Sequence, residues 1–182
     1  MEQLIAEFGH TTSIGFPVIV ARLLLAAAFG AAIGFEREWR DRPAGLRTHM
    51  LVCIAAATFA ILTIEIANSP VFSGGNFKEA VRFDPVRMVE AVTAGVAFLA
   101  AGTILFTKGE VRGLTTGAAM WLAGAIGLAA GLGLWQIAAV VTLLSLVVLG
   151  LLQALESKLI SRPGKPDAAA KKAEESPRDT FG

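Results

Sequence analysis

Five long apolar runs dominate the chain, at about residues 16–35, 48–66, 85–106, 113–131 and 133–155. About 20 consecutive apolar residues are what an α-helix needs to cross the hydrocarbon core of a bilayer. Most charged residues lie between these runs or near the ends of the chain. The pattern predicts an all-α integral membrane protein, a bundle of five transmembrane helices. The alternative is four spans with a surface helix at either end.

Composition supports one membrane domain rather than a soluble core with an anchor. Hydrophobic residues make up 54% of the 182 residues and charged residues 17%, against about 25% charged in a typical soluble domain. We expect an extracytoplasmic segment over residues 1–15, the membrane domain over 16–158 and a disordered tail over 159–182, where Pro, Lys, Ala and Glu leave little to bury. A net charge of +1 gives no global field for nucleic acid.

The distribution of basic residues predicts the orientation, because short cytoplasmic loops collect Lys and Arg. The 67–84 loop carries only Lys78 and Arg82, and the segment before Arg22 carries none. The other loops and the start of the tail hold Arg37, Arg40, Arg42, Arg47, Lys108, Arg112, Lys158, Arg162 and Lys165. The N-terminus is therefore expected on the outer side of the membrane and the C-terminus in the cytoplasm.

Small residues recur at four-residue spacing inside the runs. Gly30 and Gly34 form one such pair, and Gly127 and Gly131 form another. Faces of this kind let helices approach closely in a membrane, where apolar burial alone does not drive association. They indicate close packing within one bundle or, alternatively, the seam of a homo-oligomer.

Three ordered motifs give the chain a family resemblance. They are Arg22–Leu25 with Gly30–Glu38 and Ala44–His49, then Asp84–Arg87 with Gly95–Gly102, and then Val111–Trp121. Together they resemble the MgtC/SapB family of bacterial membrane proteins. The resemblance implies a five-helix inner-membrane domain and a link to growth at low magnesium. In its best-studied branch it implies restraint of the proton-driven ATP synthase and a folded C-terminal domain, in whose place this chain has the short tail.

Three ionisable residues, Arg22, Glu65 and Glu90, lie within or near the outer ends of the predicted spans. Arg22 is about two turns into the first span and Glu90 about one and a half turns into the third, at similar depth in the outer third of the bilayer. A charge near the bilayer centre costs roughly 2.5–3.5 kcal/mol on insertion scales. We expect an intramembrane pair between Arg22 and Glu90, static or part of an ion or proton site. Separate snorkelling of each to water is the alternative.

Two further polar groups are expected at the outer and inner faces. The outer-face cluster comprises Glu65, Asp84 and Arg87, where Asp84 either caps the third helix or contacts a cation, and no metal is assigned. The cytoplasmic-face set comprises Glu36, Arg37, Glu38, Arg47, Thr48, His49 and Arg112. It serves either to set topology and contact anionic lipid or to dock a membrane protein partner. Arg47–His49 are the best docking candidates because they enter the second helix.

No catalytic signature is present in the sequence. The P-loop, the nucleophile elbow, GxGxxG and HExxH are all missing. Cys53 follows His49 by one helical turn, but two ligands do not make a zinc site, and a packed core thiol is expected. We therefore expect a non-enzymatic protein without a cofactor.

Three functions fit these observations. The first is regulation of a membrane partner, such as the ATP synthase or a transporter, during magnesium limitation or acid stress. The second is a transporter or channel subunit for Mg²⁺ or protons, which would need polar residues along a path through the midplane. The third is a structural scaffold that only packs.

Overall fold

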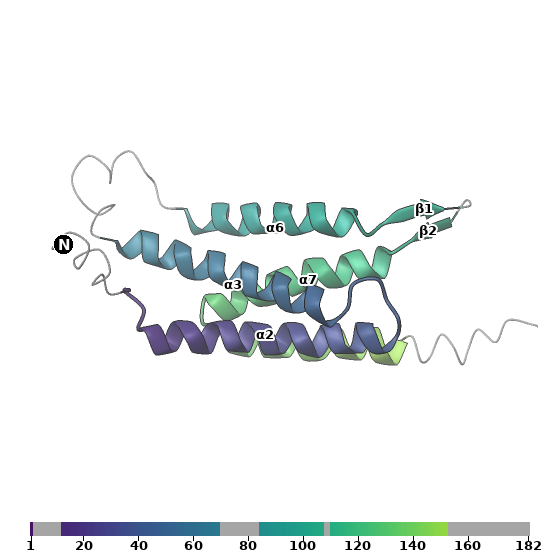
Figure 1. The fold of residues 1–182 in the computed structure, drawn as a ribbon, viewed down its shortest axis with the longest axis horizontal. Coiled ribbons are helices and arrows are strands. Elements are labelled where there is room, and N and C mark those ends of the chain that lie inside the picture. Colours follow the sequence, from purple (N-terminus) through teal and green to yellow (C-terminus); the bar gives the residue numbers. More distant parts are fainter. Residues whose placement is uncertain (2–11, 70–83, 108–109, 153–182) are drawn as a thin grey trace, which may run out of the picture.

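The chain folds into a bundle of helices whose axes run along its length (Figure 1). A computed structural model describes residues 12–69, 84–107 and 110–152, together with Met1. The elements are α2 (Phe16–Trp39), α3 (Leu46–Asn68), α6 (Pro85–Ala101), β1 (Leu105–Thr107), β2 (Glu110–Arg112), α7 (Leu114–Gly131), α8 (Trp135–Val147) and the π-helix η1 (Val148–Leu152).

Each predicted run contains one α-helix, so the mostly helical fold is confirmed. Three of these helices, α2, α3 and α7, are long and apolar enough to cross a membrane. Helix α6 has 17 residues and α8 has 13. The predicted tail at 159–182 and most of the 67–84 loop lie outside the described residues.

The third predicted span is wrong at its C-terminal end, because helix α6 stops at Ala101 and not at residue 106. Thr103 donates its hydroxyl to the carbonyl of Ala100 at 2.7 Å. The chain then enters an antiparallel hairpin in which Leu105 pairs with Arg112. An apolar run does not by itself distinguish helix from strand, which is why the run appeared continuous. Gly113, at a φ of +88°, turns the hairpin into α7, and a Cβ there would collide with the Thr103 carbonyl.

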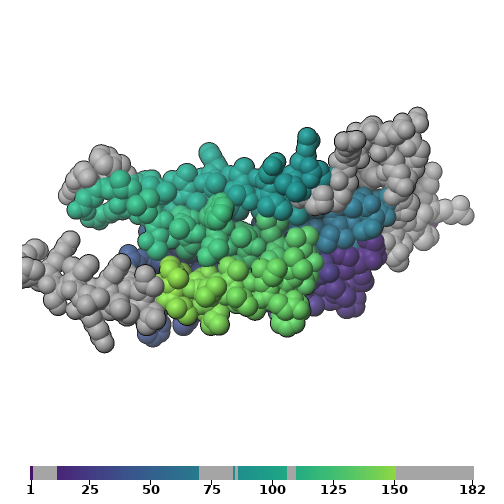
Figure 2. Space-filling model, turned by 180° about the vertical axis from the view of Figure 1, so that it is seen from behind, coloured from purple at the N-terminus to yellow at the C-terminus, as the bar shows by residue number. Residues whose placement is uncertain are grey.

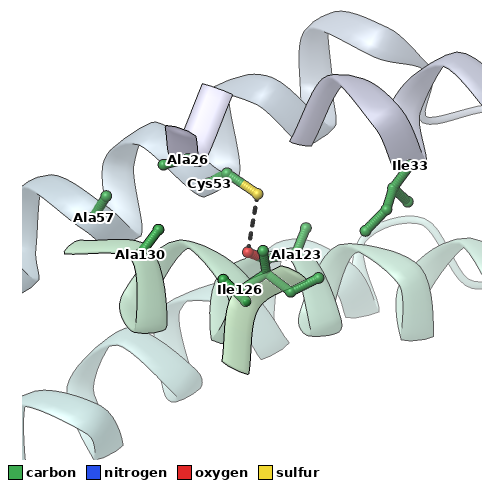
Figure 3. Close-up of a cluster of buried hydrophobic side chains, with 8 residues drawn as sticks. Ala26, Ile33, Cys53, Ala57, Ala123, Ile126 and Ala130 are labelled. Atoms are coloured by element: carbon green, nitrogen blue, oxygen red, sulfur yellow. Dashed lines mark hydrogen bonds between the residues drawn. The ribbon is translucent and has the colours of Figure 1, made fainter. Parts of the chain in front are cut away.

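Helix α7 is the central element and packs against α2, α3, α6 and α8. Seen from behind, α8 and η1 lie on one side of α7 and α6 on the other (Figure 2). The main core cluster joins α2, α3, α7 and α8 through small and aliphatic side chains: Ala26, Ile33, Cys53, Ala57, Ala123, Ile126, Ala130 and Ala138. The thiol of Cys53 donates to the Ala123 carbonyl at 3.1 Å (Figure 3). The prediction of a packed core thiol is confirmed.

The repeated glycines bring backbones together inside the bundle. A Cβ at Gly30 would lie 2.7 Å from the His49 carbonyl oxygen, and one at Gly34 would lie 2.7 Å from the Leu46 Cα. A Cβ at Gly131 would lie 2.5 Å from the Ala57 carbonyl oxygen. Real Cβ atoms do not approach backbone so closely, so α3 can lie against both α2 and α7 only because these positions lack one. The interpretation as packing within one bundle is confirmed for these glycines.

Candidate functional site

Most of the charged residues that the structure describes gather at one end of the bundle, called here the arginine-rich end. It comprises the last turns of α2, the 40–45 loop, the first turn of α3, strand β2 and the first turn of α7. The loop between α2 and α3 and the hairpin lie together at this end (Figure 1). The loop turns back through Asp41, which has a positive φ of 50°. Four elements therefore place polar side chains around the N-terminus of α7.

Arg37 is the most deeply placed charge of this end, with only 1% of its surface exposed. Its Nη2 donates to Thr116 Oγ1 at 3.2 Å, and its Nε has no acceptor. Among the residues described, no carboxylate lies within ion-pair distance of Arg37, and the ion pairs are Arg40–Glu36 and Arg112–Glu110. Thr116 belongs to the first turn of α7, where free backbone N–H groups form the positive end of the helix dipole. A buried cation thus faces a positive helix end.

Two carboxylates, Glu36 and Glu38, lie near Arg37, and Glu36 acts on it electrostatically although neither Glu36 oxygen has a hydrogen-bond partner. Glu38 accepts a hydrogen bond from the backbone N–H of Leu46 at 2.8 Å and so caps the start of α3. Glu36 pairs with Arg40 at 2.6 Å, one helical turn along α2. Arg40 also reaches the carbonyl of Gly150 in η1 at 3.5 Å. Neither carboxylate forms an ion pair with Arg37.

His49 is fully buried beside this cluster. Its Nδ1 donates to the Gly45 carbonyl at 3.0 Å, since a carbonyl can only accept, and its Nε2 has no partner. Both Glu36 and Arg37 are close enough to act on it electrostatically. The imidazole therefore fixes the entry of the chain into α3 from inside the bundle.

The structure divides the predicted cytoplasmic-face set into surface and interior residues. Glu38, Arg47 and Arg112 are exposed, whereas Glu36 and Thr48 are half-buried. Arg37 and His49 are buried and have no surface to offer a partner. Their inclusion in a docking surface is corrected for that reason.

An apolar groove of about 360 Å³ lies between α2, α7 and α8. Side chains from α2, α7 and α8 line it, among them Ile33, Thr115, Val141 and Val148. Ile33 lies one turn before Arg37 on α2, and Thr115 is adjacent to Thr116. Neither Arg37 nor Thr116 is among the residues that line the groove.

At the opposite end, Arg22 has a different partner from the one expected. Its Nη1 donates to the Gly131 carbonyl at 2.9 Å, and its guanidinium also lies against Gly133, where φ is +83°. No ion pair between Arg22 and Glu90 occurs in the described part of the chain. Glu90 lies on an exposed face of α6, and α6 packs on α7 and α3, across the bundle from α2 (Figure 1). The prediction that Arg22 and Glu90 pair across the first and third spans was wrong.

The predicted outer-face residues make separate local contacts. Asp84 accepts from the backbone N–H of Val86 at 3.0 Å, so its capping role is confirmed. The Glu65 carboxylate accepts from the backbone N–H groups of Ser13 and Ile14 and from the Ser13 hydroxyl, at 2.8–2.9 Å. Arg87 is exposed. No group of three potential metal ligands is found among the residues that the structure describes.

Sequence reasoning missed the partners of both Arg22 and Arg37. Thr116 lies in the third motif, but its spacing from Arg37 carries no sign of contact. The acceptor for Arg22 is a backbone carbonyl, which no side-chain pattern marks. The glycines of the 131–133 turn were the available signal, because they create room for a large side chain beside a helix C-terminus.

Comparison with known proteins places the chain in a family. Residues 23–158 match the MgtC family. The chain is 40% identical over 142 residues to protein MgtC of Brucella suis, covering 76% of this chain and 54% of that protein. It is 38% identical over 136 residues to protein SrpB of Synechococcus elongatus, covering 70% of this chain and 71% of that protein.

A third relative carries a functional name. YhiD of Escherichia coli strain K12, named as a candidate magnesium transporter, is 36% identical over 143 residues, covering 79% of this chain and 64% of that protein. The chain thus spans between half and two thirds of the length of several curated relatives that it matches. No solved structure matches the chain. The family match over most of the chain, with the apolar helices, makes this a membrane protein that belongs to the MgtC family.

Proposed function

We propose that the chain is a multi-pass protein of the bacterial inner membrane, with five spans, the N-terminus outside and the arginine-rich end in the cytoplasm. Helices α2, α3 and α7 meet the length and apolarity of a span. Helix α8 continues directly into η1, and together they run from Trp135 to Leu152. At about 1.5 Å per residue this length approaches the ~30 Å hydrocarbon core. Clustered arginines at one end support the orientation.

Cysteine accessibility tests this orientation. Thr12 and Glu110 are exposed at opposite ends of the bundle, and Cys53 is buried, so a Cys53→Ser background leaves a single reporter. An impermeant thiol reagent should label Thr12→Cys in intact cells and Glu110→Cys only after permeabilisation. The reverse pattern would overturn the orientation, and labelling of both in intact cells would overturn the five-span arrangement.

The chain acts, in this proposal, without enzymatic chemistry on a membrane partner during magnesium limitation or acid stress. The observation that carries this proposal is the apolar interior: alanines and aliphatic side chains fill the space between α2, α3, α7 and α8. Such a core supports a role through the surface more than conduction through one copy. Exposed Glu38, Arg47 and Arg112 supply a charged surface for contact. The family resemblance suggests the proton-driven ATP synthase as the partner.

Co-reconstitution tests the partner. Liposomes carrying ATP synthase, with or without this chain, should show slower ATP-driven proton uptake when the chain is present. The double variant Arg47→Glu with Arg112→Glu should restore uptake, because it inverts two exposed charges without touching the core. Unchanged uptake with the wild-type chain would reject the ATP synthase as the partner.

A cation transporter is the second candidate, favoured by the name of the relative YhiD. Liposomes containing the chain alone, loaded with a magnesium-sensitive or a pH-sensitive dye, separate the two functions. A regulator gives no flux above empty liposomes. Saturable Mg²⁺ or proton flux would replace the regulatory proposal by transport.

A further inference from the structure

Helix α6 carries two charges on a face that no other described element covers. The helix lies along one side of the bundle, where it packs on α7 and α3 (Figure 1). Arg87 and Glu90 are both exposed, and neither takes part in an ion pair within the described part of the chain. In the proposed membrane placement this face meets lipid, where an exposed charge costs free energy.

Depth makes Glu90 the costlier of the two charges. It is the sixth residue of α6, so its Cα lies about 8 Å along the helix from the N-terminal end. The whole helix has 17 residues and a length of about 25 Å, less than the ~30 Å hydrocarbon core. Arg87 is nearer the end and can extend its long side chain to water. Glu90 has a shorter side chain and a longer way to go, so it gains more from a cation at its own depth.

The same face of α6 continues with small side chains beside one large aromatic ring. Exposed Ala94 and Ala101 follow Glu90 at helical spacing along this face. On one flank Phe98 projects, with 84% of its surface exposed. On the other flank, about 100° around the helix, Ala97 and Ala101 line a groove of about 460 Å³ between α6 and α7. A projecting ring and a hollow therefore lie at the same depth on opposite flanks.

We propose that this face is a homodimer seam, in which α6 packs in parallel on α6 of a second copy and Arg87 pairs with Glu90 of the partner subunit. Two copies inserted with the same orientation are related by a two-fold axis along the membrane normal, so residues of equal depth meet. Arg87 and Glu90 are about 4.5 Å apart along the helix. Cα–Cβ bonds tilt toward the helix N-terminus, which brings the Glu90 carboxylate toward the level of Arg87. The symmetry then gives two reciprocal ion pairs.

The shape of the face favours a second copy over an unrelated partner. In a parallel helix pair, one flank of each helix faces the opposite flank of the other. The Phe98 ring of each copy therefore faces the groove beside Ala97 of the other. Ala94 lies at the centre of the seam, where a small side chain permits close approach. A second copy supplies the cation, the anion, the ring and the hollow at once, because the face is complementary to itself.

The proposal rests on the membrane placement of the bundle, but on neither its orientation nor its regulatory partner. Cysteine labelling reports the orientation whether or not α6 forms a dimer. Slower ATP-driven proton uptake tests the regulatory partner and does not require a dimer. Failure of the seam is therefore distinguishable from failure of the proposed function.

Disulfide crosslinking of the full chain in liposomes tests the seam. In a Cys53→Ser background, Ala94→Cys places one thiol at the centre of the seam. Ala91→Cys is the matched control, an exposed alanine of α6 about 60° away, in the groove that faces α3. At a high lipid-to-protein ratio, Ala94→Cys should form dimers about tenfold faster, because a disulfide needs Cα atoms within about 7 Å. Equal rates for the two variants, or no dimer from Ala94→Cys, would overturn the proposal.

Exchange of the two charges tests the ion pairs. Arg87→Glu and Glu90→Arg, each added to Ala94→Cys on differently tagged chains, place like charges across the seam. Each variant alone should form about tenfold less dimer than its parent. Mixing the two variants in one liposome should restore the crosslink between differently tagged chains, since every cation then faces an anion. A pair formed within one helix gives no such rescue, so its absence would reject the seam.

Phe98→Ala tests the fit between ring and groove. It should reduce the crosslink of Ala94→Cys about tenfold, the loss expected from burial of one aromatic side chain. Leu143→Ala removes another exposed side chain, on α8, and should leave the crosslink unchanged. Equal losses from the two variants would assign the contact to unspecific association. Crosslinking of Ala94→Cys only to a different protein in cell membranes would assign the face to another partner, and either result overturns the proposal.

Discussion

Arg22 and Arg37 lie on the same helix, contact the same neighbour and have opposite electrostatic surroundings. Arg22 donates to the Gly131 carbonyl at the C-terminus of α7, the negative end of the helix dipole. Arg37 contacts Thr116 at the N-terminus of α7, the positive end. Because α2 and α7 run antiparallel, one arginine complements the dipole and the other opposes it. The difference teaches that Arg22 is stabilised by the helix end that it contacts, whereas Arg37 is held against a helix end that repels its charge and is opposed there only by the nearby Glu36 carboxylate among the residues described.

The largest effect is expected from disturbing the close approach of α7 to α3 at Gly131, the residue whose carbonyl accepts from Arg22. A Cβ at Gly131 would lie 2.5 Å from the Ala57 carbonyl oxygen, and backbone cannot rotate away as a side chain can. Gly131→Ala should therefore destabilise the purified protein by about 3 kcal/mol, at the upper end of overpacking costs. Chemical or thermal unfolding in detergent measures it.

Gly117→Ala is the matched control at the other end of α7. A Cβ there would lie 3.2 Å from the Ala100 carbonyl oxygen, a contact that a small shift relieves. Its cost should be clearly smaller than that of Gly131→Ala. Equal costs for the two variants would show that the approach of α3 to α7 is not the tighter of the two contacts.

The next effect tests Arg22 itself. Arg22→Met keeps an unbranched chain of similar length but loses the charge and the bond to Gly131. We expect a loss of about 2 kcal/mol, the range for a charged hydrogen bond and for a cation at a partly buried helix C-terminus. Unfolding in detergent measures it, and Arg22→Lys, which keeps the charge, should lose less. If Arg22→Met were as stable as wild type, the hydrogen bond from Arg22 to the end of α7 would not stabilise the bundle.

The earlier expectation for Arg22 shows what a sequence can and cannot predict here. Hydrophobic runs placed the five helices, and Asp84 correctly marked the start of α6. They did not predict which helices are neighbours, because in a membrane apolar faces point to lipid as well as to protein. The similar membrane depth and opposite charge of Glu90 therefore suggested it as the partner of Arg22. In the fold, Arg22 contacts α7 instead.

The same limit explains why the contacts of the candidate site could not be predicted from the sequence. The motif containing Glu36, Arg37 and Glu38 was recognisable as important, but three adjacent charges on a helix point in different directions. Folding sends Arg37 inward, Glu38 to the start of α3 and Glu36 to Arg40. Only the packing of α2 against α3 and α7 decides among these directions. The close approach of α2 to α3 depends on Gly30 and Gly34, and that of α7 to α3 on Gly127.

Arg37→Met is expected to change the stability of the protein in the opposite direction from Arg22→Met. Replacing a buried charge by an apolar side chain of similar volume is often neutral or stabilising. In lipid-free detergent we expect Arg37→Met to be as stable as wild type or about 1 kcal/mol more stable. A loss as large as that of Arg22→Met, without lipid, would mean that Arg37 is already compensated within the fold.

The smallest expected effect concerns Glu38, whose carboxylate caps the start of α3. The first turn of α7 contains no acidic residue. Its carboxylate accepts from the Leu46 N–H at 2.8 Å, and the absence of a Cβ at Gly45 leaves room for it. Glu38→Gln keeps an oxygen acceptor and removes only the charge, so the loss should be about 0.5 kcal/mol, the usual value of a charge at an exposed helix N-terminus. High salt should weaken the difference between the two proteins, since the carboxylate is exposed. Unfolding at two salt concentrations measures both effects. Because Arg37 is buried and Glu38 is not, salt should leave the behaviour of Arg37→Met unchanged, and a shared salt dependence would show that both helix starts belong to one solvent-screened network.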